Sequence, residues 1–285
     1  MSWGTPDDGA GRRGQATPTA GTPWWSRPLR WRKLRQRRLS LPSQQKEVPV
    51  LAPDTPPARR AASEVAGAAE SVAEAVKPRL RGWVHAGTAP LALVASVVLV
   101  ALAPPGAATV STAVFGVSAV LLFGTSAVYH RGTWSPRAAA LLRRLDHSNI
   151  FLLISGTYTP LAVLLLPAST ARVLLTVVWV GAVAGILMRV LWLGAPRWIY
   201  VPVYVALGWV AVWFLPDFSR AGSPTIMWLV IAGGACYTLG AVVYGTKRPN
   251  PSPRWFGFHE IFHVGTVGGY WCHYAAVALA VAAVA

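Results

Sequence analysis

Long apolar runs, separated by short polar or proline-containing segments, dominate the chain after residue 86. A transmembrane helix needs about 17–25 mostly apolar residues, and backbone groups in lipid must pair within their own segment, so these runs predict helices and not strands. Breakers such as Pro104-Pro105-Gly106 and Gly194-Ala195-Pro196 separate the runs. The pattern predicts seven spanning helices, at approximately 87–103, 108–129, 148–166, 173–193, 198–215, 225–244 and 261–285. The expected fold is therefore all-α, with a bundle of seven transmembrane helices in residues 81–285.

The first 80 residues have a different pattern. Residues 1–58 are rich in Pro, Gly and Arg and have no apolar periodicity, which predicts a disordered basic tail. Residues 59–80 are Ala-rich with regularly placed Glu, which predicts an amphipathic interfacial helix that ends at Lys77-Pro78. No apolar stretch near the start resembles a signal peptide.

Composition strengthens the membrane assignment. The chain is 54% hydrophobic and only 13% charged, whereas soluble domains are about 25% charged. Its net charge is +16, and a cluster of Trp and basic residues in the tail, between Trp24 and Arg38, suggests contact with anionic lipid headgroups. The alternative is a solvated tail that only sets topology, and no nucleic-acid partner is expected. Cys236 and Cys272 lie inside apolar runs without a C-x-x-C pattern, which excludes a disulfide framework and thiol-based zinc or redox sites.

The basic residues of the connections predict the orientation of the bundle. Alternate connections are basic, and the basic ones lie on the side of the strongly basic N-terminus. Because basic loops stay in the cytoplasm, the N-terminus is predicted to be cytoplasmic in a multi-pass protein of the cell membrane. Arg189, inside the fourth run, is expected to extend its side chain toward the same side.

Ionisable residues inside membrane helices are costly and are therefore functional candidates. The predicted orientation brings His130, Asp146, His259 and His263 to one depth, near the cytoplasmic side. His259 and His263 are four residues apart, which places both imidazoles on one helix face. Ser126 lies one turn before His130 on the same face. Three histidine ligands with an open position for water are typical of a catalytic zinc site, so these histidines are the predicted zinc ligands.

The remaining histidines have simpler interpretations. His85 and His147 are expected to be interfacial residues that hydrogen-bond to backbone or water. His273 lies ten residues after His263, roughly 15 Å along a helix, so it cannot share a metal with it and is expected to hydrogen-bond within the bundle.

Three motifs in three helices resemble the hemolysin III family. They are Ser126-Ala-Val-Tyr-His130, Leu145-Asp146-His147 leading to Ile150–Pro160, and His259-Glu260-Ile-Phe-His263. This family is the bacterial branch of the progestin and adipoQ receptors (PAQR), and it is more distantly similar to alkaline ceramidases. The resemblance implies seven helices, a cytoplasmic N-terminus and a zinc ion on the three histidines, with Asp146 and Ser126 beside the water that the metal holds. Many members carry an acidic residue and an Asn or Thr before the early histidine, where this chain has Arg81-Gly-Trp-Val-His85.

These observations favour a zinc-dependent membrane hydrolase of a lipid-like amide or ester, with Asp146 as the proton acceptor and Ser126 as a hydrogen-bonding partner. The alternatives are a membrane receptor or stress sensor with a structural zinc, and a pore-forming haemolysin, although the runs lack the polar stripes of a water-filled channel. His259-Glu260-x-x-His263 also fits the pattern of zinc metalloproteases. That interpretation is weaker because no acid follows Glu260 to serve as a third ligand, and Glu260 is expected to be a supporting or interfacial group.

Overall fold

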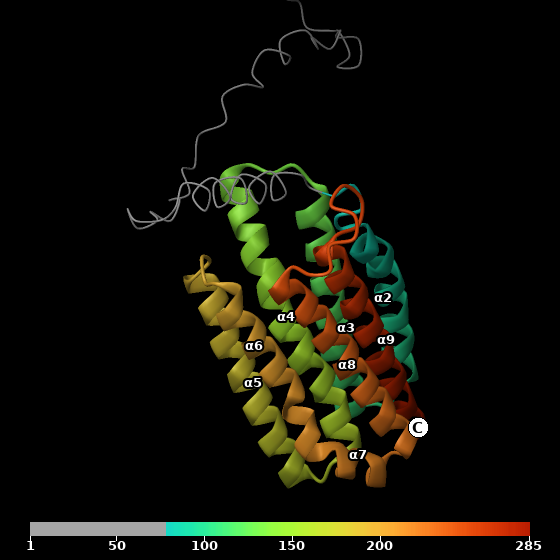
Figure 1. Ribbon diagram of the computed structural model, residues 1–285. Helices are drawn as coiled ribbons and strands as arrows, with labels where there is room; N and C mark the ends of the chain where they lie inside the picture. The colour runs from blue at the N-terminus through green and yellow to red at the C-terminus, as the bar shows by residue number, and fades with distance from the viewer. Residues whose placement is uncertain (1–77) are drawn as a thin grey trace, which may run out of the picture. The chain divides into compact units, whose positions relative to one another are not determined.

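The computed structural model describes residues 78–285, which form a bundle of helices with no β-strand in that range (Figure 1). The helices are α2 (Trp83–Leu102), α3 (Ala107–Arg131), α4 (Pro136–Leu165), α5 (Ala168–Leu191), α6 (Arg197–Gly208), the 3₁₀ helix η3 (Trp209–Phe214), α7 (Leu215–Ala221), α8 (Pro224–Thr246) and α9 (Phe258–Ala282). The segments predicted within 1–77 lie outside the described residues. The last residues of the predicted interfacial helix, at 79–80, form a turn that leads into α2.

Seven segments are long and apolar enough to cross a membrane, which confirms the predicted fold class. Six are single α-helices, whereas the fifth joins α6, η3 and α7 into one continuous span over Arg197–Ala221. The short 3₁₀ stretch tightens the winding in the middle of that span.

The third span begins much earlier than its apolar run predicted, at Pro136 instead of residue 148. The added turns carry Arg137, Arg143 and Arg144, which an apolar search rejects although Arg and Ala are good helix formers. Ser135 caps this helix by accepting a hydrogen bond from Ala138 N–H, and Pro136 occupies the first turn, where a missing N–H has no cost.

Helix α9 packs against α2, α3, α4 and α8. Its closest neighbour is α8, and the two backbones nearly touch at Gly240 and Gly265. A Cβ on Gly265 would lie 2.8 Å from Cys236 O, so a larger residue would push the helices apart. Small residues at such crossings are typical of membrane bundles, where packing drives association.

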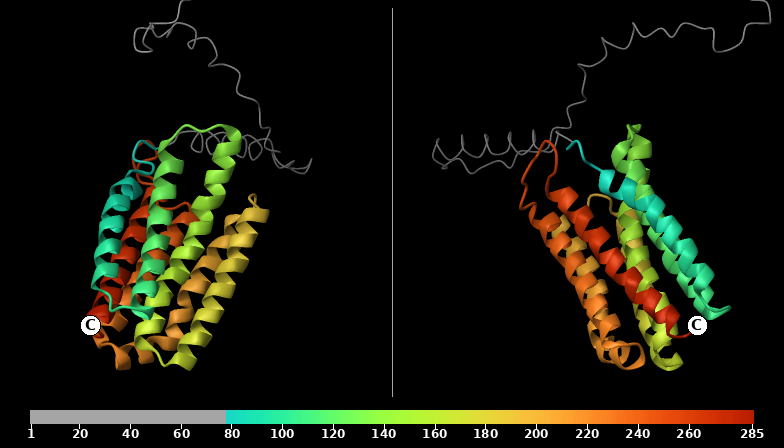
Figure 2. Two further views of the ribbon diagram at one scale, coloured as in Figure 1. Left: turned by 180° about the vertical axis from the view of Figure 1, so that it is seen from behind. Right: turned by 90° about the vertical axis from the view of Figure 1, so that its right-hand side faces the viewer.

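The two ends of the bundle differ in charge. One end holds the connections 132–135, 192–196 and 247–257, and we call it the basic end because these connections and the helix ends beside them carry most of the Lys and Arg of the described residues. The opposite end has only Arg172 and Arg220. The C-terminus lies at the end opposite the 247–257 connection (Figure 2). Cys236 and Cys272 are free cysteines, as predicted.

Candidate metal centre

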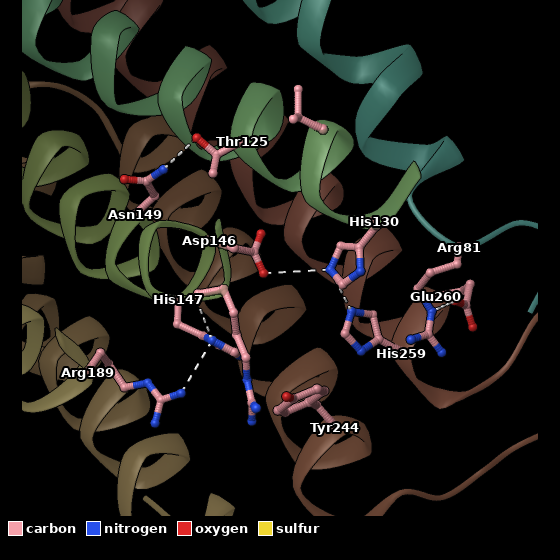
Figure 3. A network of polar contacts seen from close by, with 12 residues as sticks. Arg81, Thr125, His130, Asp146, His147, Asn149, Arg189, Tyr244, His259 and Glu260 are labelled. Atoms are coloured by element: carbon pink, nitrogen blue, oxygen red, sulfur yellow. Dashed lines mark hydrogen bonds and ion pairs between the residues drawn. The ribbon is translucent and has the colours of Figure 1, made fainter. Parts of the chain in front are cut away.

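Three histidines from two helices converge near the basic end of the bundle. His130 comes from the last turn of α3, and His259 and His263 come from the first turns of α9. Each offers a ligand atom within 4.8 Å of the others, and Nε2 of His259 lies 3.3 Å from Nε2 of His130 (Figure 3). The three histidines that the sequence analysis grouped by spacing and predicted depth therefore lie together in the structure.

Asp146 and Ser126 lie beside this cluster, as the motifs implied. The Asp146 Oδ2 atom is 3.6 Å from His130 Nε2, and both residues appear in the same polar network (Figure 3). Ser126, on the turn of α3 before His130, is buried and lines the same small cavity as Asp146. The long α4 of the structure explains the position of Asp146, because the turns before it extend past the apolar run.

The donor set fits a zinc ion. Two imidazole nitrogens that face each other at 3.3 Å either share a proton or direct their lone pairs at one cation. The third imidazole and a carboxylate lie beside them, and a three-histidine set with a nearby oxygen is typical of catalytic zinc. His263 Nδ1 is buried without a hydrogen-bond partner among the described residues, so this ring is not held by a protein hydrogen bond at that atom.

Two cavities adjoin at this point of the bundle. A small one of about 30 Å³ is lined by Ser126, Asp146 and two of the cluster histidines. A larger apolar one of about 140 Å³ extends between α4, α6 and α8. They share the following lining residues: Leu122, Ile150, Tyr204, Ala241, Phe262 and Thr266. A chain-like apolar molecule in the larger cavity would therefore place one end beside the histidines.

His85 is a member of the site that the sequence interpretation missed. Its ring stacks on His263 with centroids 3.7 Å apart and planes 11° from parallel, and it lines the small cavity. It is 2% exposed, and neither ring nitrogen has a hydrogen-bond partner among the described residues. The sequence analysis expected an interfacial histidine and did not foresee this stacking against a proposed zinc ligand. Helix α2 packs against α9, and no residue spacing in the sequence predicts that contact.

Glu260 faces away from the cavity. It is fully buried, pairs with Arg81 Nε, and accepts the Gly257 N–H at 2.8 Å, which caps the first turn of α9 (Figure 3). It does not line either cavity, so its position does not support the general-base role that the metalloprotease pattern requires. Arg81, just before α2, thus has its ion-pair partner on α9.

The structure also places three further ionisable side chains for which the sequence analysis stated an expectation: His147, His273 and Arg189. His147 Nδ1 lies 2.8 Å from Arg143 O, which agrees with a backbone-bonded histidine, although the residue is buried. His273 Nε2 lies 3.2 Å from Val230 O, so it bonds within the bundle as predicted. Arg189 does not extend toward the surface: it is 0% exposed and packs over the ring of Tyr200. That prediction was wrong because the α5 face that carries Arg189 turns inward, toward α4 and α6.

The fold and site define a class: an integral membrane protein with seven membrane-spanning segments and a three-histidine cluster near one end of the bundle. A family model described as "Haemolysin-III related" matches residues 73–274, and the chain belongs to that family. It is similar to "Hemolysin-3 homolog" of Bacillus subtilis (strain 168), with 30% identity over 163 residues that cover 56% of this chain and 72% of the relative. It is also similar to "Hemolysin-3" of Bacillus cereus, with 30% identity over 165 residues that cover 57% and 71%.

Proposed function

We propose that this protein is a zinc-dependent hydrolase that cleaves an amide or ester bond of a lipid-like substrate at the basic end of the bundle. The observation that carries the proposal is the junction between the histidine cluster and the apolar cavity. Three imidazoles, a carboxylate and a hydroxyl gather at one end of a cavity whose remaining walls are almost entirely apolar. A structural zinc needs no such cavity.

The apolar cavity supports a substrate with a hydrocarbon chain. It is lined by aliphatic and aromatic side chains, among them Leu153, Ile154, Leu161 and Val230. Burial of each CH₂ group contributes roughly 0.8 kcal/mol, so even a short chain would be held firmly. The shared lining directs the polar end of such a molecule toward Ser126 and Asp146.

Zinc, when bound, lowers the pKa of water toward 7 and polarises a carbonyl group. Among the described residues, Asp146 is the only carboxylate that lines either cavity, and in this proposal it accepts a proton from a water molecule at the cluster. It can return that proton to the leaving group. Ser126 supplies a hydroxyl that can orient the carboxylate or donate to the oxygen on which charge develops.

A test separates the proposed proton transfer from binding. Asp146→Asn keeps the size of the side chain but removes the proton acceptor, so detergent-purified protein with zinc restored should keep its metal and lose roughly 10²–10⁴-fold in turnover. Ser126→Ala should lose less, because it removes one hydrogen bond. The assay is release of fatty acid from a panel of ceramide-like and phospholipid substrates.

The matched control is Asp217→Asn. Asp217 lies at the opposite end, where it is paired with Arg220 at 2.7 Å on the exposed surface, so its loss should leave turnover unchanged. Full zinc content without turnover on any lipid would favour a sensor with a structural metal. Unchanged turnover in Asp146→Asn would remove this residue from the mechanism.

A further inference from the structure

We propose that Arg189 and Arg197, with the hydroxyl groups of Tyr200 and Tyr244, form an oxyanion subsite beside the metal centre, which takes the phosphate or carboxylate group of an anionic ligand. That this anion belongs to the substrate rests on the proposed function. The subsite itself rests on contacts that do not involve the metal.

Arg189 is a buried cation without a counter-ion among the described residues. Its side chain is inaccessible to solvent, and neither Nε nor Nη1 has a hydrogen-bond partner among the described residues. The three side-chain acids of residues 78–285 are engaged elsewhere: Asp146 with His130, Asp217 with Arg220, and Glu260 with Arg81. A buried charge is costly unless it is paired, so this guanidinium calls for an anion from outside the described chain.

The contact between Arg189 and His147 does not compensate the charge. Arg189 Nη2 lies 3.3 Å from His147 Nδ1 (Figure 3). However, His147 Nδ1 also lies 2.8 Å from Arg143 O. A carbonyl oxygen only accepts hydrogen bonds, so Nδ1 must carry its hydrogen and point it at Arg143. It then has no lone pair for the guanidinium. The face of Tyr200, 4.3 Å from Arg189 Cζ, attracts the cation but accepts none of its in-plane N–H groups.

A second arginine repeats this arrangement on the neighbouring ring. Arg197 Cζ lies 4.8 Å from the centroid of the Tyr244 ring, and its Nη1 is also buried without a partner. The hydroxyls of Tyr200 and Tyr244 lie 3.2 Å apart. One of them donates to the other, which leaves one hydroxyl hydrogen free of that bond.

The unpaired groups of the two guanidiniums are N–H donors that carry positive charge. The phenolic oxygens beside them can donate the free O–H and can also accept. The two cations therefore favour an oxyanion over an alcohol or a metal ion. The flat N–H edge of a guanidinium matches two oxygens of a phosphate or carboxylate.

The cluster borders the candidate metal centre. Tyr200 and Tyr244 line the small cavity together with Asp146 and His259, and His147, which contacts Arg189, lines it too. Arg197 begins α6, where the free N–H groups of the first turn add to the attraction for an anion. A ligand with its hydrocarbon chain in the apolar cavity and a charged group at these arginines would therefore present the bond between them near the histidines.

The test uses full-length protein in detergent with two probes, inorganic phosphate and dioctanoyl phosphatidic acid, and uncharged dioctanoylglycerol as the reference lipid. Affinity is measured by calorimetry, and the thermal unfolding midpoint is recorded with and without each probe. We expect Arg189→Met and Arg197→Gln each to weaken binding of the charged probes at least tenfold. Arg137→Gln removes an exposed arginine from the same end of the bundle and should change the affinity less than twofold.

The thermal unfolding midpoints of the proteins without an added probe are an independent test. Without an anion, Arg189→Met should unfold at the same temperature as the wild type or higher, because it removes an uncompensated buried charge. Adding the phosphatidic acid should raise the midpoint of the wild type and leave that of Arg189→Met unchanged. If Arg189→Met does not fold, the half-buried Arg197→Gln decides the question alone.

The probes also identify the source of the anion. Much tighter binding of phosphatidic acid than of phosphate supports a lipid headgroup, and equal binding supports free phosphate in the same subsite. Equal affinity in wild type, Arg189→Met and Arg197→Gln would overturn the proposal, as would an equal loss in Arg137→Gln. Repeating the titration in His130→Ala separates this subsite from the metal, because binding there should still depend on Arg189 whether or not the protein proves to be a hydrolase.

Discussion

His85 on α2 lies flat against His263 on α9, with the ring centroids 3.7 Å apart and the planes 11° from parallel. Phe123 meets the same His85 ring edge-on at 5.1 Å, so the imidazole is clamped between two helices. The stack therefore supports the ring plane of a proposed metal ligand.

The stack predicts a difference between two substitutions of His85. His85→Phe keeps a flat ring against His263 and should retain near-normal zinc affinity, whereas His85→Ala leaves a gap beside the ligand and should lose affinity by about 10–100-fold, as residues that orient ligands do. Zinc competition with a chelating dye on purified protein measures both. If both variants lost zinc equally, the nitrogens of His85 and not its stacking would support the metal.

The proposed ligands have a matched control on the same helix. His130→Ala, His259→Ala and His263→Ala should each lose most of the bound zinc, because two remaining protein ligands hold the ion poorly. His273→Ala should keep it, since that residue hydrogen-bonds to Val230 O in another part of α9. Metal analysis by mass spectrometry decides between them. Zinc loss confined to His273→Ala would refute the assignment.

Much of the fold follows from the apolar pattern alone. Helix count and order were predictable because lipid forces each span to be a continuous apolar helix. The start of α4 could not be predicted, because Arg137 and Arg143 interrupt the apolar pattern without interrupting the helix. The change to a 3₁₀ helix at η3 could not be predicted either, because the apolar run continues through Trp209–Phe214. Predictions on the tail, including lipid adhesion by the Trp and Arg cluster, stay predictions.

Helix periodicity and loop charge predict which residues of the candidate site share one depth in the membrane. Those two signals place His130, His259 and His263 at one depth, and they place Asp146 there as well. They say nothing about which faces of distant helices meet. For that reason the contact of His85 with His263, and the inward position of Arg189, emerged only from the packed bundle.

The ion pair between Arg81 and Glu260 predicts that substitution of Glu260 lowers stability. The metalloprotease pattern predicts instead that the substitution abolishes catalysis. Glu260→Gln keeps an acceptor for Gly257 N–H but leaves the Arg81 charge without its partner. We expect a loss of about 1–3 kcal/mol in the free energy of unfolding, with zinc content and turnover per folded molecule unchanged. Denaturant titration in detergent measures the stability.

A double-mutant cycle provides the control for this pair. Arg81→Gln alone should destabilise the protein by a similar amount, and the double variant should lose less than the sum because the two residues share one interaction. A specific collapse of turnover in Glu260→Gln, with stability intact, would instead return Glu260 to a catalytic role.

The orientation of the bundle is tested at its two ends. The basic end carries the connection 247–257, and basic connections remain in the cytoplasm, so this loop and the N-terminus are predicted to be cytoplasmic. Asn250 accepts a hydrogen bond from Phe258 N–H, so a reporter cysteine is better placed at the exposed Pro251. In a background with both native cysteines replaced by alanine, Pro251→Cys should resist a membrane-impermeant maleimide in intact cells and react after permeabilisation. Ser169→Cys, exposed at the opposite end, should react in intact cells. The reverse labelling pattern would invert the bundle and place the histidine cluster on the outer side of the membrane.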